Sequence, residues 1–248
     1  MKTTTKNSTK NIQNLTSLWK TVGNIFNVYS KKSEFEFCEI QHSEWPNRIW
    51  GVPNITQNIL ESIQQKIATT NATITLPIWN ELNTKQKMLL EHNGFVFIFE
   101  QIGMSLVLNQ PLKTNGSILL KQVTNLDEAE LWSTLFKESF GYAISTETIV
   151  KTCKSVCYYL AYDKNTAVGT AITHTTNKVV GIHSVGIPPA MRRKGYAAEI
   201  MKLLINTSLE NNAELITLQA SNMGKNIYLK LGFKEEFVIK NYRWIQQS

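Results

Sequence analysis

One stretch constrains the fold of this 248-residue chain more than any other: residues 185–198, with the sequence VGIPPAMRRKGYAA. The apolar run that begins at Val179 predicts a strand ending at Ile187, where two prolines stop it. Apolar residues at helical spacing then predict an amphipathic helix over 196–211. A strand that leads through a basic loop into a helix is typical of an anion-binding site.

Elementary physics supports that interpretation. The N–H groups of the first helical turn have no partner inside the helix, and the helix dipole favours a negative charge beside them. Gly195 and Ala197 lack bulk, so a pyrophosphate can approach the backbone closely, and Arg192, Arg193 and Lys194 add positive charge. The alternative is a charged helix start on a solvated face. Because basic residues at a helix N-terminus oppose the dipole, we expect a ligand there instead.

The stretch resembles motif A of the GNAT superfamily of N-acetyltransferases, Arg/Gln-x-x-Gly-x-Gly/Ala, with Arg192, Gly195 and Ala197 in register. Residues 228–233, YLKLGF, resemble the superfamily's motif B. The predicted order of elements from about Ser117 to Trp244 is also similar to that fold. Together, the two motifs are far more specific than either alone.

The resemblance implies how acetyl-CoA would bind. Its pyrophosphate would lie on the amides of residues 193–198, and its pantetheine arm would pair with the strand edge at Val185 and Ile187. Strands 179–187 and 215–220 would be parallel neighbours that splay apart to admit it. The implied cofactor-binding residues are Val185, Ile187, Arg192, Arg193, Lys194, Gly195, Tyr196, Ala197 and Ala198.

Two residues are candidates for catalysis. Tyr228 stands where many members carry a tyrosine that protonates the departing CoA thiolate; the alternative is an aromatic core residue. His183 is the candidate general base, because period-two alternation would direct it the same way as Val185 and Ile187. A histidine hydrogen-bonded on the sheet is the alternative. Asn222 is better explained as a helix cap than as a CoA contact. Glu199, just after the loop, is only a weak candidate for a functional role.

The resemblance implies an N-acetyltransferase that moves an acetyl group from acetyl-CoA to a primary amine of a small molecule or peptide, by direct attack in a ternary complex. Phe140 and Tyr142, between two predicted helices, are candidate acceptor contacts. A non-catalytic acyl-CoA-binding regulatory module is the alternative. The Rossmann class is excluded because no Gly-x-Gly-x-x-Gly follows a strand.

The net charge and the cysteine content constrain the function less than the two motifs do. A net charge of +7 favours anionic partners in general, but no nucleic-acid motif accompanies it, so we expect no nucleic-acid partner. Three cysteines without a supporting His pair predict neither a disulfide framework nor a metal site. With no signal-like or membrane-spanning run, we expect a cytoplasmic protein that does not bind membranes and is a monomer or homodimer.

The pattern predicts two mixed α/β domains in tandem, each a mostly antiparallel mixed sheet flanked by helices. Residues 1–14 are predicted to be a disordered tail, 15–112 an N-terminal domain, and 117–248 the GNAT-like domain. An echo between 88–95 and 226–233 indicates that the first half is a degenerate copy without the cofactor loop. Strands 95–99 and 103–108 are predicted to form a hairpin.

Overall fold

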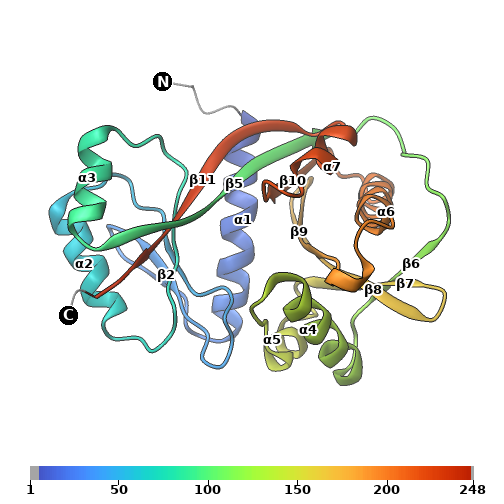
Figure 1. Cartoon of the computed structure of the whole chain (residues 1–248), viewed down its shortest axis with the longest axis horizontal. Helices are drawn as coiled ribbons and strands as arrows, with labels where there is room; N and C mark the ends of the chain where they lie inside the picture. Colours follow the sequence, from blue (N-terminus) through green and yellow to red (C-terminus); the bar gives the residue numbers. More distant parts are fainter. Residues whose placement is uncertain (1–5, 247–248) are drawn as a thin grey trace.

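The computed structural model describes residues 6–246 (Figure 1). A three-stranded sheet has the order β1-β2-β3, and an eight-stranded sheet has the order β4-β11-β5-β10-β9-β8-β7-β6. The mixed α/β class expected from the sequence is confirmed. Two chain halves are visible, one at each end of the larger sheet, and helix α1 (Lys6–Ile25) lies between them.

The C-terminal half contains most of the larger sheet. Its strands are β6 (Ile118–Gln122), β7 (Cys157–Asp163), β8 (Thr166–Thr176), β9 (Val179–Gly186) and β10 (Leu215–Ala220). Its helices are α4 (Leu126–Phe140), α5 (Thr146–Thr152), α6 (Tyr196–Glu210) and α7 (Lys225–Lys230), and a short 3-10 helix covers Pro189–Met191. The predicted strand 179–187, helix 196–211 and strand 215–220 agree with β9, α6 and β10 to within one residue. Local capping bonds define the helix starts. The Asn125 side chain, for example, accepts from the Glu128 amide at the start of α4.

The N-terminal half is smaller and has its own core. It comprises β1 (Ser30–Lys31), β2 (Glu36–Cys38), β3 (Arg48–Trp50), α2 (Gln57–Ile67), β4 (Leu76–Ile78) and α3 (Thr84–His92), followed by β5 (Phe95–Val107). A parallel bridge joins Arg48 to Thr75, so β3, α2 and β4 form a strand-helix-strand unit. The succession strand-strand-strand-helix-strand-helix-strand therefore occurs in both halves, in β1–β5 and again in β7–β11.

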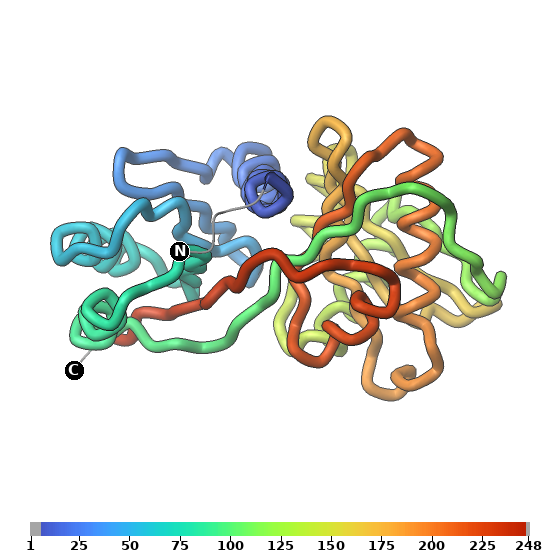
Figure 2. The backbone as a smooth tube through the Cα atoms, turned by 90° about the horizontal axis from the view of Figure 1, so that it is seen from above, coloured from blue at the N-terminus to red at the C-terminus, as the bar shows by residue number. Residues whose placement is uncertain are grey.

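The predicted hairpin within 95–108 is wrong, because these residues form the single strand β5. In its second part β5 lies between β10 and β11 (Lys234–Trp244), pairing antiparallel with both. Residues 240–242 of β11 in turn pair with β4. Each half thus receives a strand from the other, and Figure 2 shows β5 and β11 crossing side by side from one half to the other. The boundary at 112–117 stays a prediction, since strands from both sides of it belong to the same eight-stranded sheet.

The predicted tail is also corrected, in so far as it falls within the described residues: 6–14 are the first part of α1. Polar side chains, not apolar ones, hold this part of the helix to the sheet. The buried Asn11 amide donates to the backbone carbonyls of Met104 and Leu218, and the buried Asn14 amide donates to that of His174. The polar composition of this segment had predicted a disordered tail. Its asparagines can nevertheless be buried, because their side-chain amides donate hydrogen bonds. Residues 1–5 lie outside the described part.

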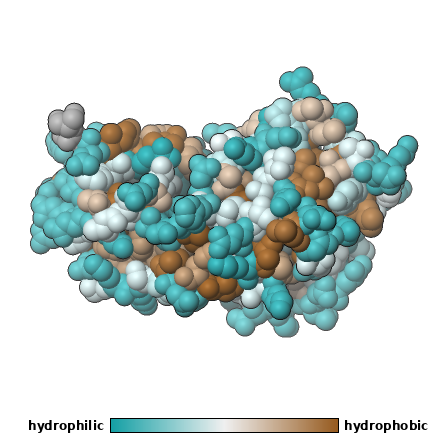
Figure 3. All heavy atoms as spheres, turned by 90° about the horizontal axis from the view of Figure 1, so that it is seen from below, coloured by the Kyte–Doolittle hydropathy of each residue, from teal (hydrophilic) through white to brown (hydrophobic). Residues whose placement is uncertain are grey.

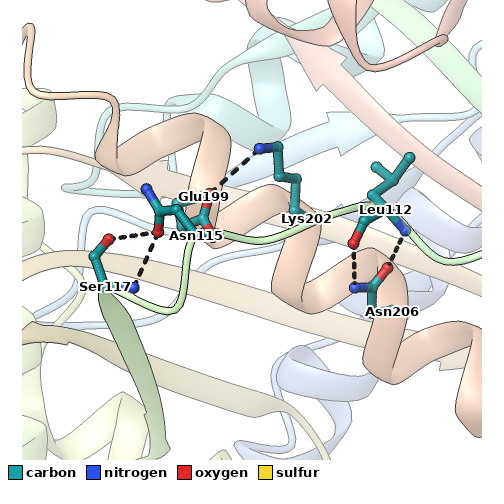
Figure 4. A network of polar contacts seen from close by, with 6 residues as sticks. All are labelled: Leu112, Asn115, Ser117, Glu199, Lys202 and Asn206. Atoms are coloured by element: carbon teal, nitrogen blue, oxygen red, sulfur yellow. Dashed lines mark hydrogen bonds and ion pairs between the residues drawn. The ribbon is translucent and has the colours of Figure 1, made fainter.

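The segment between the halves is held along α6 (Figure 4). The Asn206 side chain donates to the Leu112 carbonyl at 2.8 Å and accepts from the Leu112 amide at 2.7 Å. Glu199, buried in the first turn of α6, accepts from the Asn115 amide and pairs with Lys202. Glu199 therefore anchors the connecting segment, a role that the sequence did not reveal.

Helices cover both faces of the larger sheet. Residues of α1 and α4 pack with β7 and β8 in one core cluster, and α6 packs with β8, β9 and β10 in another. A third cluster, within the N-terminal half, includes Tyr242 from β11. On the face in Figure 3, hydrophilic residues predominate and hydrophobic ones form separate patches, some near the middle of the molecule. Within residues 6–246, no helix combines the length and apolarity needed to cross a bilayer.

Candidate active site

The basic loop lies where β9 gives way to α6, as predicted. Arg192, Arg193, Lys194 and Gly195 are exposed. Gly195 caps the helix with φ at 84°, a conformation that favours glycine, and no atom lies within 4 Å of the position its Cβ would take. Within the described part of the chain, the amides of residues 193–198 donate to no acceptor. Six unpaired donors beside three cations are arranged as an anion would require.

The three cations do not act alike. The guanidinium of Arg192 donates to two backbone carbonyls, those of Ile187 at 3.0 Å and Ser139 at 3.1 Å. It therefore ties the end of α4 to the end of β9. Arg193 and Lys194 form no hydrogen bond or ion pair with any described residue. These two side chains, not Arg192, are free to contact a phosphate.

Tyr196 and Gly186 fix the surroundings of the loop. The Tyr196 hydroxyl donates to the Asp163 carboxylate at 2.6 Å, a bond that raises the phenol pKa and ties the helix start to the end of β7. Only the Tyr196 backbone is left for a ligand. At Gly186, a Cβ would lie 2.6 Å from the Phe140 ring, so only glycine lets α4 approach β9 this closely.

The expected splay between β9 and β10 is present. The parallel register runs from Val179–Leu215 to Gly181–Thr217 and goes no further. Beyond it, β9 continues to Gly186 and β10 to Ala220 without pairing with each other. Val185, and Ile187 just after the strand, lie beyond the last β9–β10 pair, although the Ile187 carbonyl already accepts from Arg192.

The alternation argument for His183 is wrong. Ser184 has a positive φ of 55°, and the β8–β9 register shifts between Thr170 and Ile172, so β9 carries a bulge. Val185 and Ile187 consequently pack with the α6 core. The His183 ring instead bonds Gln219 through Nδ1 at 3.0 Å, and Gln219 bonds Asn11 of α1. His183 therefore lies in the polar contact between the sheet and α1.

The lowered pKa of His183 is also evidence against a role as general base. Burial, with a smaller contribution from His174, lowers its pKa to about 3. An alkylammonium has a pKa near 10.4, so transfer of its proton to such a base is uphill by about 7 pKa units, or ~10 kcal/mol. His183 is neutral at pH 7 but too weak a base for the predicted role.

Tyr228 lies on α7 and packs against the α6 core, with its ring 5.9 Å from that of Phe233. Burial raises the pKa of its phenol to about 12, so the hydroxyl keeps its proton at neutral pH. That hydroxyl forms no hydrogen bond within residues 6–246. Asn222 does not cap α7 as predicted: Gly224 precedes the helix, and Ser221 accepts from the Gly224 amide.

Phe140 and Tyr142 lie where α4 leads into α5. Their ring centroids are 6.2 Å apart, and Phe140 is the ring that meets Gly186 at the end of β9. Tyr142 lines a cavity of about 770 Å³ whose other walls come mainly from the N-terminal half. We call this cavity the inter-half cleft; its lining includes Glu39, Glu44, Arg48, Thr75, Phe99, Tyr142 and Arg243.

Two further features bear on ligands. A cavity of about 820 Å³ lies at the far end of the N-terminal half, beside Lys87 and Phe97, and shares no residue with the loop or the cleft. Among residues 6–246 there is no group of three or more His, Cys, Asp or Glu side chains placed to hold a metal ion.

Comparison with known proteins agrees with this geometry. Residues 124–233 match the model of the acetyltransferase (GNAT) family. A GCN5-related N-acetyltransferase from Kribbella flavida superposes with a TM-score of 0.70 at 14% identity, covering 96% of this chain and 97% of that one. A GCN5-related N-acetyltransferase from Sphaerobacter thermophilus gives 0.63 at 16% identity, covering 85% and 76%. No curated protein matches the sequence. The first superposition extends the shared fold to the N-terminal half.

Proposed function

Because residues 124–233 form a domain of the acetyltransferase (GNAT) family, we propose that this protein transfers an acetyl group from acetyl-CoA to a primary amine of a small molecule or peptide. The observation that carries the proposal is the row of unpaired amides at residues 193–198, set between exposed cations and the part of β9 that has separated from β10. The pyrophosphate would accept from these amides, and the pantetheine arm would follow the β9 edge at Val185 and Ile187.

The reaction is direct attack. The amine nitrogen forms a bond to the acetyl carbon, the carbon–sulfur bond breaks, and the electron pair leaves with the CoA sulfur. Tyr228 would donate a hydrogen bond to that sulfur, since its phenol is protonated and has no protein partner. The amine attacks in its neutral form, and once its nitrogen is bonded to the acetyl carbon that nitrogen is acidic enough to lose a proton to solvent. The thiolate takes a proton from solvent, so the reaction needs no proton transfer to His183, whose burial makes it a weak base.

The alternative, a non-catalytic acyl-CoA-binding module, is favoured by one observation. Helix α1 lies against β8, β9 and β10, and the polar side chain expected to be the base is bonded within that contact. Turnover separates the two functions: a binding module releases no CoA when amines are added, whereas the enzyme does.

Calorimetry with acetyl-CoA tests the cofactor site. The wild type should bind saturably, and Gly195→Asp should abolish binding, because a carboxylate would enter the anion site on a strained backbone. Gly116→Asp is the matched control. Gly116 also has a positive φ, 70°, with no atom within 4 Å of its Cβ position, but it lies in the connecting segment. Equal loss in both variants would mean that backbone strain, not a ligand site, explains the effect.

A further inference from the structure

The inter-half cleft contains an unusual cation. Arg48, on β3, is half-buried, and its guanidinium carbon lies 4.9 Å from the centre of the Trp19 ring. Burial lowers its pKa below the ordinary value, yet arginine keeps its proton in proteins. Among residues 6–246 it has no ion pair and no hydrogen bond. The Trp19 ring does not neutralise this charge, and a partly desolvated charge without a counter-ion is costly unless a ligand supplies one.

The guanidinium borders the cleft. The guanidinium carbon lies over the Trp19 ring and Arg48 lines the cavity, so a ligand in the cleft can reach donors that no protein group uses. A planar fork of this kind fits the two oxygens of a carboxylate. Two carboxylates, Glu39 and Glu44, line the same cleft and disfavour a multiply charged anion such as a phosphate.

The cleft is separated from the proposed transfer site by one loop. Tyr142 borders it, the Phe140 ring is 6.2 Å from that of Tyr142, and Phe140 touches Gly186 at the end of β9. The two halves are fastened together here: the Glu44 amide donates to the Ala143 carbonyl, and the Ala143 amide donates to the Glu44 carboxylate. A ligand in the cleft therefore lies beside the loop that separates it from β9.

We infer that Arg48 binds the carboxylate of the acceptor, and that the reacting amine is remote from this carboxylate, as in the side chain of lysine or the N-terminus of a short peptide. The remoteness follows because Tyr142 and Phe140 lie between the cleft and the end of β9. This inference rests on the proposed function, whose acceptor class it specifies.

A direct test observes Arg48 itself. In the full chain labelled with ¹⁵N-arginine, the Arg48 side-chain Nε–Hε signal, assigned by its loss in Arg48→Lys, should shift saturably with sodium acetate. Methylammonium chloride at equal ionic strength should leave it unmoved, and inorganic phosphate should shift it less than acetate. No saturable shift with acetate, or a larger one with phosphate, would overturn the carboxylate assignment.

The kinetic test compares acceptors that differ only in the carboxylate: L-lysine against cadaverine, and triglycine against triglycine amide. The acids should have a KM about 10- to 100-fold lower, the contribution of a charge-assisted bidentate bond. Arg48→Gln should remove this difference, and Arg48→Lys should restore part of it. Lysine should be acetylated at its ε-amine.

A matched control is Arg243→Gln, since the exposed Arg243 lines the same cleft and loses the same charge. It should change the preference only a few-fold. Equal use of acids and amines by the wild type, or an equal effect of Arg48→Gln on both, would refute the inference while leaving the transferase intact. Failure to bind acetyl-CoA in calorimetry would instead refute the proposed function, and the Arg48 resonance would still report on the cleft.

Discussion

The guanidinium of Arg192 donates to the backbone carbonyl of Ser139 at 3.1 Å, joining the end of α4 to the loop that precedes α6. The motif arginine therefore positions the loop from behind, while its neighbours Arg193 and Lys194 remain free. Motif residues matched in sequence can thus divide into those that shape the anion site and those that contact the anion.

Arg192→Lys should weaken acetyl-CoA binding by about 3- to 10-fold, because lysine keeps the charge but cannot bond the Ile187 and Ser139 carbonyls together. Arg193→Lys is the control and should bind almost as the wild type does, since only charge is required there. Calorimetry at two salt concentrations measures both. If Arg193→Lys were the more damaging variant, the division of roles proposed for the loop would be wrong.

Tyr228→Phe should lower kcat by roughly 100-fold while leaving the acetyl-CoA dissociation constant nearly unchanged, because only the hydrogen bond to the departing sulfur is lost. The ring and its packing against Phe233 remain. Tyr242→Phe, in the core of the N-terminal half, controls for the loss of a hydroxyl elsewhere. Unchanged kcat in Tyr228→Phe would remove this tyrosine from the mechanism.

Glu128 should make folding stability depend on acid pH. Its hydrogen bond and ion pair with Lys121 at 2.7 Å, helped by bonds from Thr124, lower its pKa from 4.5 to about 2. A lowered folded-state pKa contributes stability that is complete above pH 4.5 and is lost as pH falls toward 2. Glu128→Gln should therefore flatten urea-measured stability across that window, whereas the exposed Glu130→Gln should not. Parallel curves for both variants would contradict this assignment.

Asn206→Ala should reduce the free energy of unfolding by about 1–2 kcal/mol, because the Leu112 amide and carbonyl both lose their partner. Urea unfolding with an unchanged m-value would identify the effect as stability alone. Asn211→Ala, which loses one exposed bond to the Thr207 carbonyl in the same helix, should cost below about 0.5 kcal/mol. A similar cost for both would show that the connecting segment gains nothing from Asn206.

The sequence predicted the C-terminal elements well, because their signals are local. The two prolines after Ile187 mark the end of one strand, and Gly195 marks the start of α6. The anion loop was predictable for the same reason: its amides, cations and glycine are contiguous. Its cofactor and catalytic roles remain proposals.

The sequence alone could not predict contacts between residues that are far apart in the chain. The pairing of β5 with β10 and β11 joins residues more than a hundred positions apart, and no local pattern specifies it. The bulge at Ser184 reversed the predicted direction of His183, because a single extra residue breaks the alternation. No local sequence pattern indicated a role for Arg48, because only the fold places it against Trp19 and in one cleft with Tyr142.

The reciprocal exchange of β5 and β11 has a consequence for biosynthesis. The N-terminal half leaves the ribosome first, but its core buries Tyr242, and its strand β4 pairs with residues 240–242. That half must therefore remain incomplete until every other helix and strand of the fold has been translated, with β4 and the first part of β5 waiting for β11. A nascent chain arrested before residue 234 would therefore lack Ile239 of the first core cluster and Tyr242 of the third, and both clusters are completed only when β11 is made.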